Sequence, residues 1–574
     1  MTISPETKIV PASTGSFHRA WLPAFVLSLA VALTIISPFF WKGNASGHDF
    51  TFHAASWLDA AAQWRDGILL PRWTAGANHG FGEPRFIFYP PLSWMLGAAL
   101  GFVAPWIYVP PVFIVITQTL AGISAFTLAR RLFPRNGALF SAVCYAANPY
   151  ALLIAYMRSD FAEQLALVFF PLLILAALQI TGLIGASVRN KSRSMALLAV
   201  CFAAVWLSNA PAGVIASYSL AVIFTWVSIV RKSWRVGFEG AVALGLGFAL
   251  AGFYLAPAIY EQPWVNISEA LSSGLQPSQN FLYAVIADEE HNAFNRIASG
   301  TAVLMLILTA MSAWAAYPRD KQWQVHPVAN KIWSVFTVLA VTGAFLMLRI
   351  SAIFWTLLPK LRFVQFPWRW MSMVGVAFAC FAGGAISRNK LARHWSIAMI
   401  IAMTAILTFA ATYMVRHAWW DSEDIPVLQQ AIENDEGFEG TDEYDPVGDD
   451  HTNLPEKSVR VKLLRGTEKS GAAPDGKIHV EQWFADKKEL RVTSRQPLRV
   501  ALRLLNYPAW RVEVNDAPAI PQRTDEMNQM VVPLAAGSSH VVVRFIRTID
   551  RTVGYAVSAS GVLIVLLLFF RRAR

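Results

Sequence analysis

An early carboxylate, Asp49, follows the first long apolar segment and opens a polar, aromatic loop that closes at Phe88-Tyr89-Pro90-Pro91-Leu92. The apolar segments on either side are long enough to span a bilayer. An acidic residue at the start of such a loop lies beside the membrane surface, where its carboxylate can serve as a general base. Asp is also a common helix N-cap, and the segment Thr51–Trp64 offers a helix to cap. The residues alone leave catalysis, capping or both open for Asp49.

Two further carboxylates, Asp160 and Glu163, stand three residues apart at the start of a predicted span. That spacing places both side chains on one side of a helix. An ionised residue at membrane depth costs free energy and is by default a functional hypothesis. The structural alternative is an ion pair with the neighbouring Arg158, or a position that only marks the water interface.

Cationic candidates lie far along the chain, just before a span that begins near Trp370. Arg362 and Arg369 carry planar guanidinium groups, which bind phosphate oxygens in bidentate fashion. Gln365 lies between them and could orient either group. Arginines near the end of a span also commonly extend to the interface without binding any ligand. The predicted topology puts these cations on the same side of the membrane as the three carboxylates.

The composition indicates an integral membrane protein. Of 574 residues, 55% are hydrophobic, only 15% are charged and 22 are Trp, which is too apolar for a soluble chain of this length. The net charge of +11 comes from basic residues clustered in short loops, as the positive-inside rule expects of cytoplasmic loops. Nucleic-acid binding is therefore not predicted. All three cysteines lie inside apolar segments, which excludes a disulfide framework and a cysteine zinc site.

Hydropathy predicts about twelve membrane spans with both termini in the cytoplasm. The apolar segment Leu92–Val103 is short and lies near prolines, so we interpret it as an interfacial helix on the outer surface. Counting it as a span would move Asp160 to the cytoplasmic side. The predicted spans are Trp21–Phe40, Pro110–Ala129, Ala138–Tyr156, Phe161–Thr181, Met195–Ser208, Ala212–Val230, Phe238–Ala258, Gly300–Ala316, Ile332–Leu348, Trp370–Ile386, Ser396–Val415 and Val553–Phe570.

The chain divides into three predicted parts. Residues 1–415 form a transmembrane domain, whose long first periplasmic loop covers 41–109. Residues 416–552 begin with an acidic linker and continue as short alternating runs between turn residues, which predicts a β-sandwich outside the membrane. Residues 553–574 form a last span and a basic cytoplasmic tail. The expected fold is a polytopic α-helical membrane protein with a periplasmic, β-sandwich-like C-terminal domain.

The motifs of the chain resemble those of bacterial membrane proteins designated 6-pyruvoyl-tetrahydropterin synthase-related, although nothing in them resembles the soluble pterin enzyme. The order of the motifs is also similar to that of the wider GT-C glycosyltransferases, which include protein O-mannosyltransferases and aminoarabinose transferases of lipid A. The Gln-Phe-Pro-Trp-Arg block is fairly specific to this branch, whereas a lone early Asp is generic. The resemblance covers almost the whole chain and rests on Gly47-His48-Asp49 with His53, Gly67–Trp73, Gly80–Pro84, Phe88–Leu92, Arg158–Glu163 with Pro171, Gln365–Arg369 and Asn506–Trp510.

This resemblance implies a GT-C-like fold in the bacterial inner (cytoplasmic) membrane. It also implies transfer of a sugar from a polyprenyl-phosphate donor to an extracytoplasmic glycan, lipid or protein. In GT-C enzymes an acidic residue early in the first external loop is catalytic, and the matching residue here is Asp49. An acceptor hydroxyl must lose a proton as it attacks, and a phosphate leaving group needs cationic stabilisation. We therefore expect Asp49 and Asp160 to be catalytic. The expected substrate-binding residues are Glu163, Arg362, Gln365, Arg369, Glu83, Arg72 and Arg85.

Other chemistry finds less support in the sequence. A divalent metal is allowed but not required, because His48, Asp49, His53 and His79 match no specific ligand spacing, so no metal site is assigned. A Gly-x-Ser-x-Gly elbow, a P-loop and a Rossmann glycine fingerprint are all absent from the sequence. The alternatives to a transferase are a non-enzymatic glycolipid transporter or flippase and an assembly scaffold. Few charges lie well inside the predicted spans, which favours the enzyme over a transporter.

Overall fold

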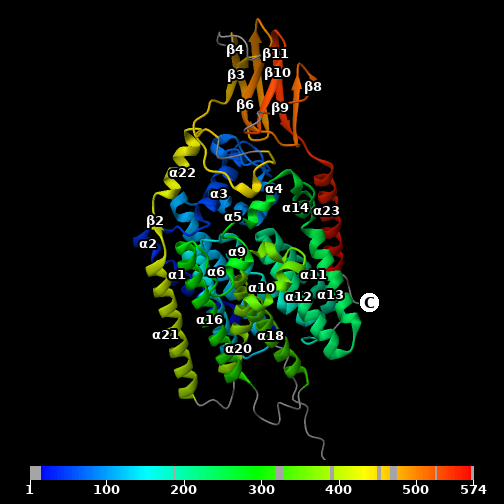
Figure 1. Cartoon of the computed structure of the whole chain (residues 1–574). Coiled ribbons are helices and arrows are strands. Elements are labelled where there is room, and N and C mark those ends of the chain that lie inside the picture. Colours follow the sequence, from blue (N-terminus) through cyan, green and yellow to red (C-terminus); the bar gives the residue numbers. More distant parts are fainter. Residues whose placement is uncertain are drawn as a thin grey trace, which may run out of the picture.

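The protein consists of a helical bundle with a strand-rich domain at one end, as the computed structural model shows (Figure 1). It describes residues 14–185, 188–317, 327–387, 393–448, 454–465, 475–523 and 527–570. The basic cluster predicted at Arg388–Arg393, except Arg393 itself, and the predicted basic tail Arg571–Arg574 lie outside these residues. In Figure 1, α21 (Arg393–His417) and α23 (Ile549–Phe570) run along opposite edges of the bundle.

Among the described residues, ten helices are long and apolar enough to cross a membrane, and two bent helix pairs bring the number to twelve. This agrees with the predicted count. The bundle helices are α1 (Thr14–Ile36), α2 (Phe39–Lys42), α6 (Val109–Ala129), α7 (Arg135–Ala146), α8 (Pro149–Leu153), α9 (Phe161–Leu167), α10 (Phe170–Ile180), α11 (Val188–Ser208), α12 (Ala210–Arg231), α13 (Trp234–Leu250), α14 (Gly252–Tyr260), α16 (Glu289–Ala316), α18 (Pro327–Leu346), α19 (Ala352–Leu357), α20 (Met371–Ile386), α21 and α23.

The predicted span Phe238–Ala258 is bent rather than straight, and a second bend lies at the end of the predicted span Ile332–Leu348. Helices α13 and α14 meet at an angle of 78°, and the pair Asn330–Leu346 and Arg349–Leu357 meets at 90°. Side chains satisfy the backbone groups that each break exposes. At the first break the Phe253 amide donates to Ser558 Oγ of α23 at 2.8 Å. At the second, Trp355 Nε1 donates to the Leu346 carbonyl at 3.1 Å. Such contacts are not visible in a hydropathy pattern.

The first loop folds into a compact layer between the bundle and the strand-rich domain (Figure 1). Its helices are α3 (Phe50–Arg65), α4 (Arg85–Phe88) and α5 (Pro91–Leu100). The segment predicted as an interfacial helix corresponds to α5, whose ten residues are too short to span a bilayer. Gly97 of α5 lies against the ring of Trp57 on α3, where no larger residue would fit. Helix α5 is therefore held by protein contacts and does not rest on the membrane surface alone.

The C-terminal domain is a pair of antiparallel sheets, which confirms the strand-rich prediction. One sheet has the order β3-β6-β10-β9 and the other the order β4-β5-β11-β7-β8. Their facing side chains form a core that also takes in Trp73 and Phe81 of the first loop. The strands are β3 (Val461–Arg465), β4 (Gly476–Trp483), β5 (Lys487–Ser494), β6 (Leu498–Leu505), β7 (Trp510–Val514), β8 (Ala517–Ala519), β9 (Gln522–Arg523), β10 (Gln529–Leu534) and β11 (Gly537–Phe545).

The acidic segment before the strands packs onto the first loop. It contains α22 (Asp424–Glu433), and just before this helix β2 (Trp420–Asp421) pairs with β1 (Asn44–Ala45). Further on, the Phe438 amide donates to the Gly76 carbonyl at 2.8 Å. The predicted acidic linker therefore contains a helix, followed by a segment at 434–448, the acidic strap, that docks on the first loop.

A buried ion pair joins α14 to α23, and Tyr507 of the strand-rich domain donates a hydrogen bond to it. Glu261, at the end of α14, accepts hydrogen bonds from Arg551 Nε and Nη2 at 2.8 Å each and from Tyr507 Oη at 2.7 Å. Glu261 is fully buried and Arg551 is 3% exposed. Two charges removed from water in this way are tolerated only because they are paired and fully hydrogen-bonded.

We predict that Glu261→Ala destabilises the protein strongly, because the Arg551 guanidinium would stay buried without a counter-charge. The expected loss is about 3–5 kcal/mol in the free energy of unfolding. It can be measured by unfolding of the purified protein in detergent. The control is Glu513→Ala, which removes a partly exposed carboxylate 3.9 Å from Arg544. Equal losses in the two variants would contradict the prediction.

Candidate active site

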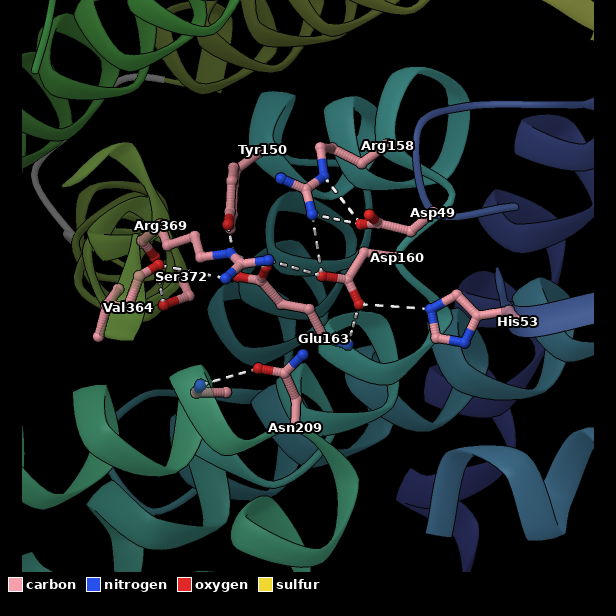
Figure 2. A network of polar contacts seen from close by, with 11 residues as sticks. Asp49, His53, Tyr150, Arg158, Asp160, Glu163, Asn209, Val364, Arg369 and Ser372 are labelled. Carbon is pink, nitrogen blue, oxygen red and sulfur yellow. Dashed lines mark hydrogen bonds and ion pairs between the residues drawn. The ribbon is translucent and has the colours of Figure 1, made fainter. Parts of the chain in front are cut away.

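A buried carboxylate, Asp160, is the centre of a network of charged side chains (Figure 2). Its Oδ2 accepts a hydrogen bond from Arg369 Nη2 at 3.1 Å, and Arg158 Nη2 lies 3.5 Å away. Its Oδ1 accepts from the backbone amide of Glu163 at 2.8 Å, which caps α9. Asp160 is 3% exposed. Both oxygens are thus committed to protein donors, and the carboxylate is held in one orientation.

An irregular turn presents these residues to the first loop. The π-helical turn η3 (Ile154–Arg158) ends in Ser159, whose φ of 52° is left-handed. Such turns frequently occur at functional sites. The first loop docks directly on it, because the Gly47 amide donates to Ser159 Oγ at 3.0 Å and the Asp49 amide to the Arg158 carbonyl at 2.9 Å. A Cβ at Gly47 would collide with this backbone, so glycine is required there.

Asp49 occupies the N-cap position of α3, as one of the two sequence interpretations expected. Its side chain makes no capping hydrogen bond among the described residues. It instead accepts from Arg158, through Nε at 3.1 Å and through Nη2. Its side chain is 31% exposed, whereas that of Arg158 is 5% exposed. Asp49 is therefore the partly exposed end of an otherwise buried network.

The Gln-Phe-Pro-Trp-Arg block supplies the opposite wall of the site. Arg369, in the short helix η8 (Pro367–Trp370), places Nε 3.2 Å from a carboxylate oxygen of Glu163. The other Glu163 oxygen accepts from Tyr150 Oη. The ring of Phe366 lies against both guanidinium groups, with its centroid 4.9 Å from Arg158 and 5.0 Å from Arg369. Cation–π contact of this kind favours a cation that has been removed from water.

The charged side chains around Asp160 determine the protonation state of its carboxyl group. Burial alone would raise the pKa of Asp160, but His53 and the guanidinium groups of Arg369 and Arg158 hold that pKa below its ordinary value. His53 is 1% exposed and its Nε2 lies 3.7 Å from Asp160 Oδ1. Neither ring nitrogen of His53 has a hydrogen-bond partner among the described residues.

Among the described residues, the Asp160 network contains no group of three metal-ligating side chains close enough to share one ion. A group of three mutually close metal-ligating side chains occurs instead on the strand-rich domain, formed by Glu481, Glu489 and His540. That group is already neutralised, because Arg491 pairs with Glu481 at 2.5 Å and Lys487 with Glu489 at 2.6 Å. The allowed divalent metal therefore gains no support from the geometry at Asp49.

The network unites four of the nine predicted site residues: Asp49, Asp160, Glu163 and Arg369. Gln365 belongs to the Gln-Phe-Pro-Trp-Arg block and Arg362 lies three residues before it, but both have other contacts. Arg362 is exposed, with its guanidinium 5.1 Å from the Phe363 centroid. Gln365 Nε2 donates to the Ala270 carbonyl at 2.7 Å.

The three candidates from the first loop also lie apart from the network. Glu83 and Arg85 form a buried ion pair at 2.5 Å. Glu83 also accepts from the Thr441 amide at 2.8 Å, so this pair fastens the acidic strap to the loop. Arg72 donates to Tyr555 Oη of α23 at 2.9 Å.

Sequence reasoning did not assign a site role to Arg158, Tyr150 or His53. Arg158 was considered only as an ion-pair partner, although it now bridges two candidate catalytic carboxylates. The signal available for it was its place in the Arg-Ser-Asp-Phe-Ala-Glu motif. Tyr150 lies inside an apolar run, where nothing in the sequence distinguishes it from a core residue.

The helical bundle and its buried charges define a polytopic membrane protein with an internal polar site. The family model "6-pyruvoyl-tetrahydropterin synthase related domain; membrane protein" matches residues 86–417, more than half of the chain. The chain belongs to this family. Among curated proteins none matches the sequence.

Several solved structures are distantly similar. ArnT from Cupriavidus metallidurans bound to undecaprenyl phosphate is 11% identical, with a TM-score of 0.43, covering 74% of this chain and 73% of that one. The arabinofuranosyltransferase AftD from Mycobacteria is 18% identical, with a TM-score of 0.41, covering 73% of this chain and 29% of that one. The Archaeoglobus fulgidus oligosaccharyltransferase with an acceptor peptide is 12% identical, with a TM-score of 0.42, covering 69% and 55%.

We predict that Asp160→Asn destabilises the protein, because two buried guanidinium groups would lose their shared counter-charge. The expected loss near neutral pH is about 3–5 kcal/mol in the free energy of unfolding. Since folding lowers the pKa of Asp160, its stabilising contribution is complete above the ordinary pKa of about 4 and is lost as the pH falls further. The difference from wild type should therefore shrink below about pH 4.

Unfolding of both proteins in detergent across this pH range measures the effect. The matched control is Asp66→Asn, at an exposed position after α3. A pH-independent difference, or an equal effect in the control, would show that the charge of Asp160 is not what stabilises the site.

Proposed function

We propose that the protein is a membrane glycosyltransferase that moves a sugar from a polyprenyl-phosphate donor to an extracytoplasmic glycan, lipid or protein. The observation that carries this proposal is a buried network of carboxylates and guanidinium groups that ends in one partly exposed carboxylate, Asp49. Buried charge at the ends of membrane-spanning helices is costly and is kept where function needs it. The motif resemblance to GT-C enzymes is consistent with the same role.

In the proposed reaction, Asp49 acts as the general base. It takes the proton of an acceptor hydroxyl as the hydroxyl oxygen forms a bond to the anomeric carbon of the donor sugar. The bond between that carbon and the phosphate oxygen breaks, and its electron pair leaves with the polyprenyl phosphate. The phosphate gains negative charge in this step, so a nearby cation lowers the barrier.

Arg158 is the proposed link between donor binding and base activation. In the structure its guanidinium donates to Asp49 from Nε and Nη2. A donor phosphate offers a stronger, bidentate acceptor for a planar guanidinium. As Arg158 turns to the phosphate, the Asp49 carboxylate is released to accept the hydroxyl proton. Arg369 and Asp160 remain paired and keep the turn in place.

We assign the site to the extracytoplasmic side of a bacterial inner membrane. The first loop and the strand-rich domain lie together at one end of the bundle (Figure 1). The predicted basic loops belong to the other side under the positive-inside rule. The domain division at residues 415 and 552 then leaves the strand-rich domain in the periplasm, where it can approach an acceptor glycan.

The proposal is tested with purified full-length protein in nanodiscs. Turnover is measured as release of undecaprenyl phosphate from a panel of undecaprenyl-phosphate-linked sugars, with an envelope glycolipid extract as the acceptor. Retention of added undecaprenyl phosphate is measured separately by native mass spectrometry. The second measurement distinguishes lost chemistry from lost binding.

We predict that Asp49→Asn lowers the turnover rate about 10²–10⁴-fold while undecaprenyl phosphate is retained, because the amide cannot accept the proton. Asp66→Asn is the control and should be unaffected. Retention by wild type without any turnover on the panel would favour the carrier or scaffold. Unchanged turnover in Asp49→Asn would remove Asp49 from the mechanism.

A further inference from the structure

A cavity lies at the base of the strand-rich domain, away from the Asp160 network. Its volume is about 320 Å³, within the range of small-ligand pockets. The first loop, the β4–β5 turn and the connection from β11 into α23 form its walls. The lining residues used below are Arg72, Asp486, Arg547, Arg551 and Tyr555.

The lining carries more positive than negative charge. Three arginines face one lining carboxylate, Asp486, which interacts electrostatically with the buried Lys488. Arg551 is neutralised by Glu261. Arg72 and Arg547 have no carboxylate partner within ion-pair distance among the described residues. Two guanidinium groups are therefore available to an anion.

Tyr555 holds these two arginines at the cavity. Arg72 Nη2 donates to its hydroxyl at 2.9 Å, and the Arg547 guanidinium lies 4.5 Å from its ring centroid. Burial lowers the pKa of Arg72, which indicates that this cation is poorly compensated by the protein alone. An anionic ligand would compensate it.

The cavity opens where α23 enters the predicted membrane. Tyr555 lies near the start of this helix, a candidate span of which only 11% is buried inside the protein. Ile549, at the first position of α23, is 84% exposed. Ile68 and Leu70 add apolar surface to the cavity wall. A ligand with an anionic head and an apolar chain can therefore place the head among the arginines and the chain along α23.

We propose that this cavity binds the phosphate headgroup of an anionic membrane lipid. Arg72 and Arg547 bind the phosphate oxygens, which guanidinium groups grip in bidentate fashion. The lipid fills the junction between the first loop, the strand-rich domain and α23, and so fixes the orientation of that domain over the bundle. This site is independent of the proposed transfer reaction.

The test uses the full-length protein exchanged into phosphatidylcholine nanodiscs that contain a minor fraction of phosphatidylglycerol. Native mass spectrometry counts the phosphatidylglycerol retained as lipid is stripped. Arg72→Gln/Arg547→Gln is compared with Arg511→Gln/Arg544→Gln, a matched pair of exposed arginines on neighbouring strands. Arg547→Gln alone removes an exposed side chain, and serves if the double variant does not fold.

We expect retention of phosphatidylglycerol to weaken at least about tenfold in the double variant and to stay unchanged in the control, because charge-assisted hydrogen bonds are lost. Asp49→Asn should retain the lipid like wild type, which separates this site from the proposed function.

A second arm identifies the source of the phosphate. Thermal stability is compared in sodium phosphate and in sodium chloride of equal ionic strength. Stabilisation of wild type by phosphate, lost in the double variant while lipid retention is equal, would overturn the lipid and assign the cavity to a soluble phosphate. If the double variant retains as much phosphatidylglycerol as wild type and phosphate does not stabilise wild type, the proposed site is overturned.

Discussion

The burial of Asp160 between two guanidinium groups constrains most of the architecture around it. A charge removed from water must be paired and hydrogen-bonded, or the protein loses several kcal/mol. Asp160 meets this requirement with Arg158 from its own turn and Arg369 from a block 209 residues further along the chain. The turn before α9 and the segment before α20 must therefore meet, and the helices attached to them are positioned by that contact.

The same pairing explains why Asp49 differs from the other acids of the site. Asp160 and Glu163 are buried and committed to protein partners, whereas the side chain of Asp49 remains 31% exposed. Its guanidinium partner, Arg158, is shared with Asp160. A base that must reach a substrate needs such access, and a cation shared between two acids can change partners without leaving either charge far from a counter-ion. The ring of Phe366 lies against both guanidinium groups.

A second buried acid, Glu261, gives the strand-rich domain its attachment. It joins the end of α14, the start of α23 and Tyr507 of the domain through three hydrogen bonds. The Glu83–Arg85 pair performs a comparable task between the first loop and the acidic strap. Several charged residues of the loop are thus structural, and the proposed chemistry rests on the few that converge on Asp160.

Residue type and motif resemblance singled out Asp49, Asp160, Glu163 and Arg369 without placing them together. Hydropathy and alternation predicted the number of spans and the strand-rich character of the C-terminal segment. Local patterns suffice for these features because they depend on periodicity and residue type. Tertiary structure alone decided that Asp49 pairs with Arg158, 109 residues away, instead of capping α3. The ion pair between Glu83 and Arg85 and the two helix bends are also apparent only in the tertiary structure. Each outcome depends on which groups are buried together, and residue spacing along the chain does not indicate this.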